Sequence, residues 1–221
     1  MIKGLIFDFD GLILDTESPE YETWSKIFAD YGCHFSLEEW QISLGTHIKD
    51  WDPAATLEER LGREIDKPGI RAEQKQRFHE SILQKTPLPG IPETLENAKA
   101  RGLKLGVASS GNLNWVQGNL KRLDLFDMFD RIVCRDHVQK VKPDPELFLR
   151  CAQELGIMPS EAIVFEDSHN GILASKAAGI FCVAVPNIVS GTPGLQTADL
   201  VLKQINAISL DELLKIAAGQ S

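Results

Sequence analysis

The chain has 221 residues, of which 43% are hydrophobic and 25% are charged, a composition typical of soluble globular proteins. This length suits one large domain, or a core with a small insertion. The formal net charge of −9 comes without a basic run, which argues against nucleic acid or an anionic membrane as the main partner.

The cysteines are dispersed and lack the paired spacing of a zinc site. No signal peptide is recognisable, so we expect free, buried thiols in a reducing compartment. No apolar stretch approaches the roughly eighteen residues that a membrane-spanning helix needs. The sequence therefore predicts a soluble, cytoplasmic protein. The cysteines are Cys33, Cys134, Cys151 and Cys182.

A short apolar run near the N-terminus stops abruptly at two carboxylates. The run ends at Phe7 and predicts a buried strand, after which come Asp8, Asp10 and Gly11. Because side chains at i and i+2 of a strand lie on one face, both carboxylates should point into the same space while Phe9 turns into the core. Crowded carboxylates repel, so the pair indicates a bound cation or a shared proton.

Two simpler interpretations compete with a functional site here. A calcium-binding EF-hand loop needs a glutamate at its twelfth position, and counting from Asp8 that position holds Pro19. A single Asp followed by Gly is often a plain turn former. Two carboxylates directly after a buried strand favour a functional site over a calcium loop or a plain turn.

Residues 16–86 carry helical signals and no strand signal. Ser18 followed by Pro19 predicts a helix start, and apolar residues then recur at three- and four-residue steps until Gly32. A segment rich in turn residues, 86–92, ends the region. Weaker helical patterns cover 37–44, 54–61 and 70–83.

Beyond residue 87, predicted strands alternate with helices about ten residues long, the pattern of a parallel sheet with right-handed crossovers. The strand ending at Phe7 belongs to this sheet. We therefore predict an α/β protein whose core is 1–15 and 87–221, with 16–86 as an all-helical insertion. The predicted helices are 93–100, 113–123, 145–155, 171–178 and 210–217, and the predicted strands are 104–108, 131–134, 162–165, 181–185 and 200–202.

Polar residues follow the other strands, at the edge where ligands of open parallel sheets bind. Ser109 and Ser110 lead from a strand into a helix, where a hydroxyl and free amides can hold phosphate, although Ser109 taken alone is more often a helix cap. Lys142 is rooted in a stiff loop by Pro143. Each of these features alone is weak evidence for a binding site. Their occurrence together at one edge of the sheet is what predicts such a site.

Glu166 and Asp167 follow the strand 162–165. In isolation, two such acids would cap the next helix. Together with Asp8 and Asp10 they complete an all-oxygen set suited to Mg²⁺, which takes a few carboxylates and keeps several waters. The sequence therefore predicts a magnesium site beside a phosphate cradle.

These residues together resemble the signature of the haloacid dehalogenase superfamily, over essentially the whole chain. The insertion after Thr16-Glu17 resembles that of the β-phosphoglucomutase-like branch of sugar phosphatases and mutases. The resemblance implies a Rossmann-like three-layer core, with 16–86 as a mobile helical cap over the site. The residues that carry it are Asp8-Phe9-Asp10-Gly11, Ser109, Lys142 and Phe165-Glu166-Asp167-Ser168.

The same resemblance implies two-step phosphoryl transfer from a small phosphorylated metabolite, by default a sugar phosphate. Asp8 would be the nucleophile, and Asp10 would protonate the leaving oxygen and then activate water, with Lys142 as the third catalytic residue. Mg²⁺ would be held by Asp8, the Asp10 carbonyl and Asp167, supported by Glu166. The implied phosphate-binding residues are Asp8, Phe9, Asp10, Ser109, Ser110 and Lys142, and the implied substrate-facing residues are Thr16 and Glu17.

Other activities within the superfamily are less compatible with these residues. Asp10 and the metal acids argue against a dehalogenase, and Asp10 argues against a phosphonate hydrolase. A non-catalytic sensor of phosphorylated metabolites would tolerate loss of catalytic groups, yet none is lost. A magnesium-dependent phosphatase, with a monomer as the default state, is the prediction.

A β-phosphoglucomutase-type mutase stays open as the alternative. Mutases tend to carry basic or hydroxyl residues after the serine loop, where this chain has Gly111 and Asn112. They also tend to carry a histidine where this chain has Glu20. A displaced Lys49 or His47 could take the place of the arginine in their next cap loop.

Overall fold

The computed structural model describes residues 1–45, 51–187, 189, 191 and 194–219. Within them, one sheet has the strand order β3-β2-β1-β4-β5-β6, and every neighbouring pair is parallel. This arrangement confirms the predicted α/β class. The strands are β1 Gly4–Phe7, β2 Lys104–Ser109, β3 Arg131–Cys134, β4 Ala162–Glu166, β5 Phe181–Ala184 and β6 Leu200–Val201.

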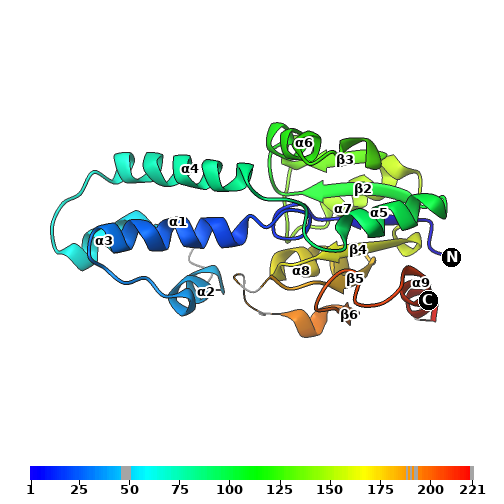
Figure 1. Cartoon of the computed structure of the whole chain (residues 1–221). Helices are drawn as coiled ribbons and strands as arrows, with labels where there is room; N and C mark the ends of the chain where they lie inside the picture. Colours follow the sequence, from blue (N-terminus) through cyan, green and yellow to red (C-terminus); the bar gives the residue numbers. More distant parts are fainter. Residues whose placement is uncertain (46–50, 188, 190, 192–193, 220–221) are drawn as a thin grey trace. The chain divides into compact units, whose positions relative to one another are not determined.

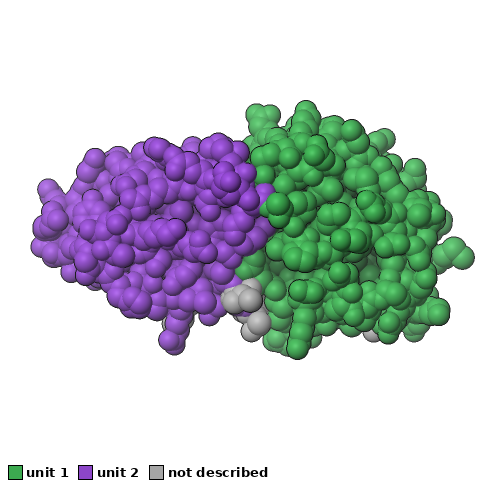
Figure 2. All heavy atoms as spheres, in the orientation of Figure 1, with its two compact units in different colours: residues 1–14, 86–188, 192–221 green, residues 15–85, 189–191 purple. Residues whose placement is uncertain are grey.

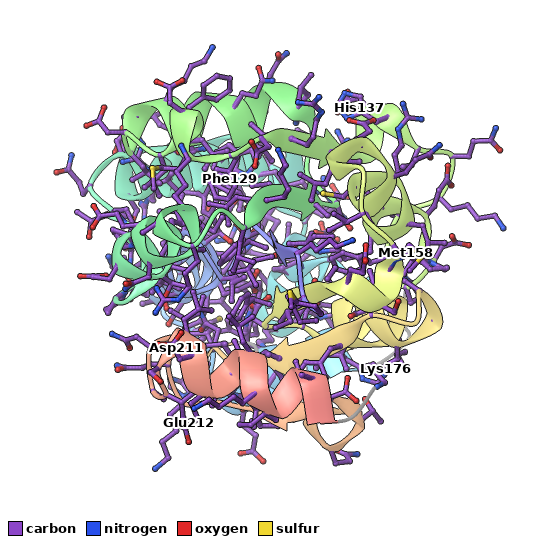
Figure 3. The ribbon with its side chains drawn as sticks, turned by 90° about the vertical axis from the view of Figure 1, so that its right-hand side faces the viewer. Phe129, His137, Met158, Lys176, Asp211 and Glu212 are labelled. Carbon is purple, nitrogen blue, oxygen red and sulfur yellow. The ribbon has the colours of Figure 1, made fainter. Side chains whose placement is uncertain are left out.

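The first strand lies at the centre of the sheet, between β2 and β4 (Figure 1). Leu5, Ile6 and Phe7 are fully buried, as expected of a strand that helices cover on both faces. The ring of Phe7 stacks on Phe165 and meets the edge of Phe129, a residue labelled in Figure 3. The carboxyl end of β1 therefore opens between the ends of its two neighbours.

Helices flank the sheet (Figure 1). The best example of an amphipathic one is α7, which packs Leu147, Phe148 and Cys151 into a core cluster with strand residues such as Ile6 and Val164. These helices are α5 Ile91–Ala100, α6 Leu113–Arg122, α7 Glu146–Leu155, α8 His169–Ala177 and α9 Leu210–Gly219, with short 3₁₀ turns η1 Phe126–Met128, η2 Arg135–His137, η3 Pro159–Glu161 and η4 Leu195–Thr197.

The chain divides into two compact units, coloured in Figure 2. Unit 1 is Met1–Leu14, Thr86–Ile188 and Thr192–Ser221, and unit 2 is Asp15–Lys85 and Val189–Gly191. Unit 2 is built on an aromatic cluster in which Phe28 stacks on Phe35, with centroids 4.5 Å apart. That it acts as a mobile cap stays a prediction. Its helices are α1 Glu17–Asp30, α2 Leu37–Gly45, α3 Pro53–Leu61 and α4 Lys67–Leu83.

Several helices start earlier than predicted, and at two of them a neighbouring side chain accepts a backbone N–H of the first turn. The first helix begins at Glu17 with Thr16 at its N-cap position, and Oδ1 of Asp15, the residue before the cap, accepts the backbone N–H of Ser18 at 3.0 Å. Likewise α8 begins at His169, because the Ser168 hydroxyl accepts the N–H of Gly171 at 3.1 Å.

The four cysteines are free thiols, as predicted, but they are not equally buried. Cys134, Cys151 and Cys182 lie in the core, whereas Cys33 is half-exposed in unit 2, which corrects the expectation of four buried thiols. Among the helices of the described ranges, none combines the length and the apolarity that crossing a membrane requires.

Candidate active site

The chain turns sharply after β1, and this turn presents the two predicted carboxylates. The N–H of Asp8 still donates to the carbonyl of Phe165 at 3.0 Å, so β1 and β4 remain paired to that point. Phe9 is fully buried, as predicted from the alternation along the strand. Backbone hydrogen bonds from Leu14 to Phe9 and from Gly11 to Leu14 then close a compact turn.

The glycine of this turn is required by its surroundings. Gly11 has a φ of +82°, a conformation that L-residues rarely adopt. A Cβ at Gly11 would lie 2.1 Å from Oδ2 of Asp167. The backbone therefore approaches a predicted metal ligand as closely as it does only because no side chain is present.

Three buried acids form a cluster at the carboxyl edge of the sheet. Asp8, Glu166 and Asp167 each place one carboxylate oxygen within 4.8 Å of the others. Their exposed fractions are 7%, 0% and 4%. Oxygen ligands of this kind suit a hard divalent cation, so these residues could hold one.

A buried lysine lies against the same acids. Lys142 Nζ donates to Oδ1 of Asp8 and, at 2.6 Å, to Oε1 of Glu166. Its side chain is 5% exposed and also lies over the ring of Phe148. One ammonium cannot balance three buried carboxylates, and this excess of negative charge fits a divalent cation in the cluster.

Burial and the neighbouring charges shift the ionisation of both partners. Burial raises the pKa of Asp8 to about 8, and Glu166 and Asp10 raise it further, while Lys142 opposes them. Burial lowers the pKa of Lys142, but the charges of Asp8 and Glu166 outweigh burial and hold that pKa above its ordinary value. A cation between the carboxylates would favour the ionised, nucleophilic form of Asp8.

Glu166 is held on both of its oxygens. Oε1 accepts from Lys142, and Oε2 accepts from the N–H and the hydroxyl of Ser168, each at 3.0 Å. A Cβ at Gly171 would lie 1.8 Å from the Glu166 carboxyl carbon, so α8 needs a glycine there. The side chain is thereby fixed where it orients Lys142.

The serine loop follows β2. The Ser109 hydroxyl accepts the N–H of Gly111 at 2.9 Å and lies 3.4 Å from Oδ2 of Asp10. Ser109 does not cap the next helix, because Asn112 does so by accepting the N–H of Trp115 at 2.9 Å. Ser109 is buried and Ser110 is exposed at the end of the same strand.

The structure adds one residue that the sequence reasoning missed. Trp115 Nε1 donates a hydrogen bond to Oδ1 of Asp10 at 2.8 Å. The two residues are 105 positions apart, and a tryptophan one turn into an amphipathic helix is ordinarily a packing residue. Its position could have indicated this contact, because Trp115 lies near the start of a helix that begins at the carboxyl edge of the sheet.

The remaining predicted residues belong to unit 2. Thr16 is buried at the N-cap of α1, and Glu17 is the first residue of that helix. Their contact with substrate remains a prediction. His47 and Lys49, considered for the mutase alternative, lie outside the described residues.

Comparisons with known proteins place the chain in a family. Residues 5–185 match the haloacid dehalogenase-like hydrolases. YhcW of Bacillus subtilis, provisionally named a phosphatase, is 43% identical over 214 residues and 97% of each chain. A "phosphorylated carbohydrates phosphatase" of Thermotoga maritima is 33% identical over 181 residues, 81% of this chain and 82% of the relative.

Structural similarity extends over the same length. The crystal structure of a Thermotoga maritima protein provisionally assigned as a β-phosphoglucomutase superposes with a TM-score of 0.80 at 28% identity, covering 97% of this chain and 99% of that one. The family match over residues 5–185 includes the acidic cluster and Lys142. The chain belongs to the haloacid dehalogenase-like hydrolase family.

Proposed function

We propose that the chain is a Mg²⁺-dependent phosphatase that hydrolyses a small phosphorylated metabolite, with sugar phosphates as the substrate class. The observation that carries the proposal is the buried cluster of Asp8, Glu166 and Asp167 with Lys142 bound against it. A phosphatase named for phosphorylated carbohydrates among the relatives supports the substrate class. The free cysteines support a reducing compartment, the cytoplasm.

The first step transfers the phosphoryl group to the protein. A carboxylate oxygen of Asp8 attacks phosphorus, the bond from phosphorus to the ester oxygen breaks, and an aspartyl-phosphate forms on Asp8. Asp10 gives its proton to the departing ester oxygen, which leaves as an alcohol. Lys142, the Ser109 hydroxyl and the backbone amide of Ser110 hold the phosphoryl oxygens.

The second step restores the protein. Water attacks the phosphorus of the aspartyl-phosphate, Asp10 takes the proton of that water, and the bond from phosphorus to Asp8 breaks to release inorganic phosphate. Asp10 is then protonated again and ready for the next substrate.

The cation in this scheme offsets the repulsion between the Asp8 carboxylate and the anionic phosphate when it is bound. Asp8, the Asp10 carbonyl and Asp167 would hold it. Glu166, whose oxygens accept from Lys142 and Ser168, supports the cluster from behind. We further propose that unit 2 caps the site during the reaction and that Thr16 and Glu17 face the substrate.

A mutase is the second candidate, favoured by the likeness to a provisionally assigned β-phosphoglucomutase. A mutase must hold a second phosphate on its substrate. Gly111 and Asn112, which follow the serine loop, add no cation for that purpose, and Asn112 is engaged as the cap of α6. Hydrolysis is therefore the better-supported function.

Phosphate release from a panel of sugar, polyol and nucleotide monophosphates tests the proposal, with Mg²⁺ or EDTA and with Asp8→Asn as the control. Release that needs both Mg²⁺ and Asp8 is the expected result. Isomerisation of β-glucose 1-phosphate with a bisphosphate primer, without phosphate release, would instead establish the mutase. Binding without turnover, equal in the Asp8→Asn variant, would point to a sensor.

A further inference from the structure

The contact between Trp115 and Asp10 has a specific geometry. The indole N–H of Trp115 donates to Oδ1 of Asp10 at 2.8 Å, and the hydroxyl of Ser109 lies 3.4 Å from Oδ2. The two oxygens of one carboxylate therefore face different partners. Oδ1 points toward α6, and Oδ2 points toward the serine loop.

The surroundings of Trp115 hold it in this position. Its backbone N–H is bound by the cap residue Asn112, and its carbonyl accepts from Nδ2 of Asn119 at 3.1 Å. A Cβ at Gly111 would lie 3.2 Å from Oδ2 of Asp10 and 3.2 Å from Cδ1 of Trp115. Because Gly111 has no side chain, the indole ring of Trp115 and the carboxylate of Asp10 have room to meet.

The chemistry of the indole distinguishes the two carboxylate oxygens. An indole N–H can donate a hydrogen bond and has no acceptor. Oδ1 of Asp10 consequently accepts whether or not the carboxyl group is protonated. Because the carbonyl-type oxygen of an acid is the better acceptor, this contact favours a proton on Oδ2 in the acid form. Oδ2 faces Ser109, which in the proposed function holds the phosphoryl group.

We infer that Trp115 is a positioning residue that orients Asp10 so that Oδ2 delivers the proton to the leaving oxygen. The inference rests on the proposed function, in which Asp10 is the general acid. Positioning of this kind matters because proton transfer requires the donor within hydrogen-bond reach of the reacting oxygen.

Trp115→Phe tests the inference, because it removes the N–H and keeps an aromatic ring. The rate kcat/KM reports the step in which the leaving group departs. A sugar alcohol is a poor leaving group and needs the acid, whereas p-nitrophenolate leaves without one. We expect Trp115→Phe to lower kcat/KM about tenfold for the best sugar phosphate and less than about threefold for p-nitrophenyl phosphate.

Two further variants separate positioning from a structural role. Asp10→Asn should lower kcat/KM more than Trp115→Phe does, again mainly for the sugar phosphate. Adding Trp115→Phe to Asp10→Asn should lower kcat/KM by less than about a further twofold, because both residues act through the same carboxyl group. Gln117→Ala, on the same helix, should leave both rates unchanged.

The outcomes are distinguishable from those of the proposed function. If Trp115→Phe lowers kcat/KM equally for both substrates, or not at all, the inference is wrong. The proposed phosphatase would still stand if the wild-type activity needs Mg²⁺ and Asp8. Full additivity with Asp10→Asn would also overturn it. A wild-type protein that hydrolyses neither substrate would overturn both.

Discussion

At the scale of single residues, several positions are determined by atoms that lie far away along the chain. Gly11 faces Asp167, and Gly171 faces Glu166, each at a distance that leaves no room for a methyl group. Both glycines thus adjoin buried acids of the proposed metal cluster. Their role is to let the backbone approach those carboxylates.

Gly11→Ala should therefore lower kcat/KM at least about tenfold, since a displaced Asp167 holds the cation less well. Gly102→Ala is the matched control, because Gly102 also has a positive φ, +70°, and a Cβ there would meet nothing within 4 Å. Gly102→Ala should lose about 1–2 kcal/mol of unfolding free energy from its positive φ alone, and Gly11→Ala should lose more, because its Cβ also displaces Asp167. Equal activities of the two variants in a Mg²⁺ titration would contradict the prediction.

Lys142→Met should destabilise the metal-free protein by about 3 kcal/mol, since the substitution leaves buried carboxylates without their ammonium partner. Mg²⁺ should then raise the melting temperature of this variant more than that of the wild type, because the cation replaces the missing charge. Thermal unfolding in EDTA and in Mg²⁺ measures both effects. A smaller shift in the variant would mean that Lys142 is needed to hold the cation.

At the scale of elements, one carboxylate connects the edge strand β6 to strand β5 and helix α8. Asp199 precedes β6; its Oδ2 accepts the backbone N–H of Cys182 in β5 at 2.8 Å, and its Oδ1 pairs with Lys176 of α8 at 2.6 Å. Lys176 is labelled in Figure 3 and lies at the surface. A short edge strand gains its place from such contacts, since β6 is only two residues long.

Asp199→Ala should lower the unfolding free energy by about 1–2 kcal/mol, because the N–H of Cys182 loses its acceptor. Lys176→Ala should cost no more than about 0.5 kcal/mol, since an exposed ion pair contributes little. Urea unfolding of the two variants at one ionic strength makes the comparison. The reverse order would show that the ion pair, rather than the backbone contact, holds β6 in place.

At the scale of the whole molecule, burial divides the cysteines between the two units. Burial raises the pKa of the Cys134 and Cys182 thiols to about 12, so both stay protonated near neutral pH. Cys151 is equally buried, and only Cys33, in unit 2, is half-exposed. The reactivity of the three buried cysteines therefore shows whether reagents can reach the core of unit 1.

A thiol reagent at pH 8 should modify one cysteine rapidly in the native protein and all four in guanidinium chloride. Cys33→Ser should abolish the rapid phase, because the thiolate is the reactive form and the other three thiols are both buried and protonated. Rapid modification that persists in Cys33→Ser would place an opening within unit 1.

The parallel α/β class was predictable because it rests on local signals, whereas the order of the strands in the sheet was not predicted. Alternating helices and strands indicated a parallel sheet, and β3 was predicted with its observed bounds, Arg131–Cys134. The carboxyl ends of parallel strands share one edge, so Asp8, Lys142, Glu166 and Asp167 could be expected together. Helix starts were less predictable: Ser168 caps α8, and Asp15, the residue before the N-cap of α1, accepts the N–H of Ser18, and propensity alone selected neither position.

The sequence by itself determined the α/β class and the candidate carboxylates, because periodicity and the i, i+2 rule act within a few residues. Only the tertiary structure decided which side chains hold those carboxylates in place. Trp115 reaches Asp10 across 105 positions, and Lys142, which was expected at the same edge, binds both Asp8 and Glu166. Such contacts depend on how α6 and the Lys142 loop pack against the sheet, and no local pattern encodes that distance.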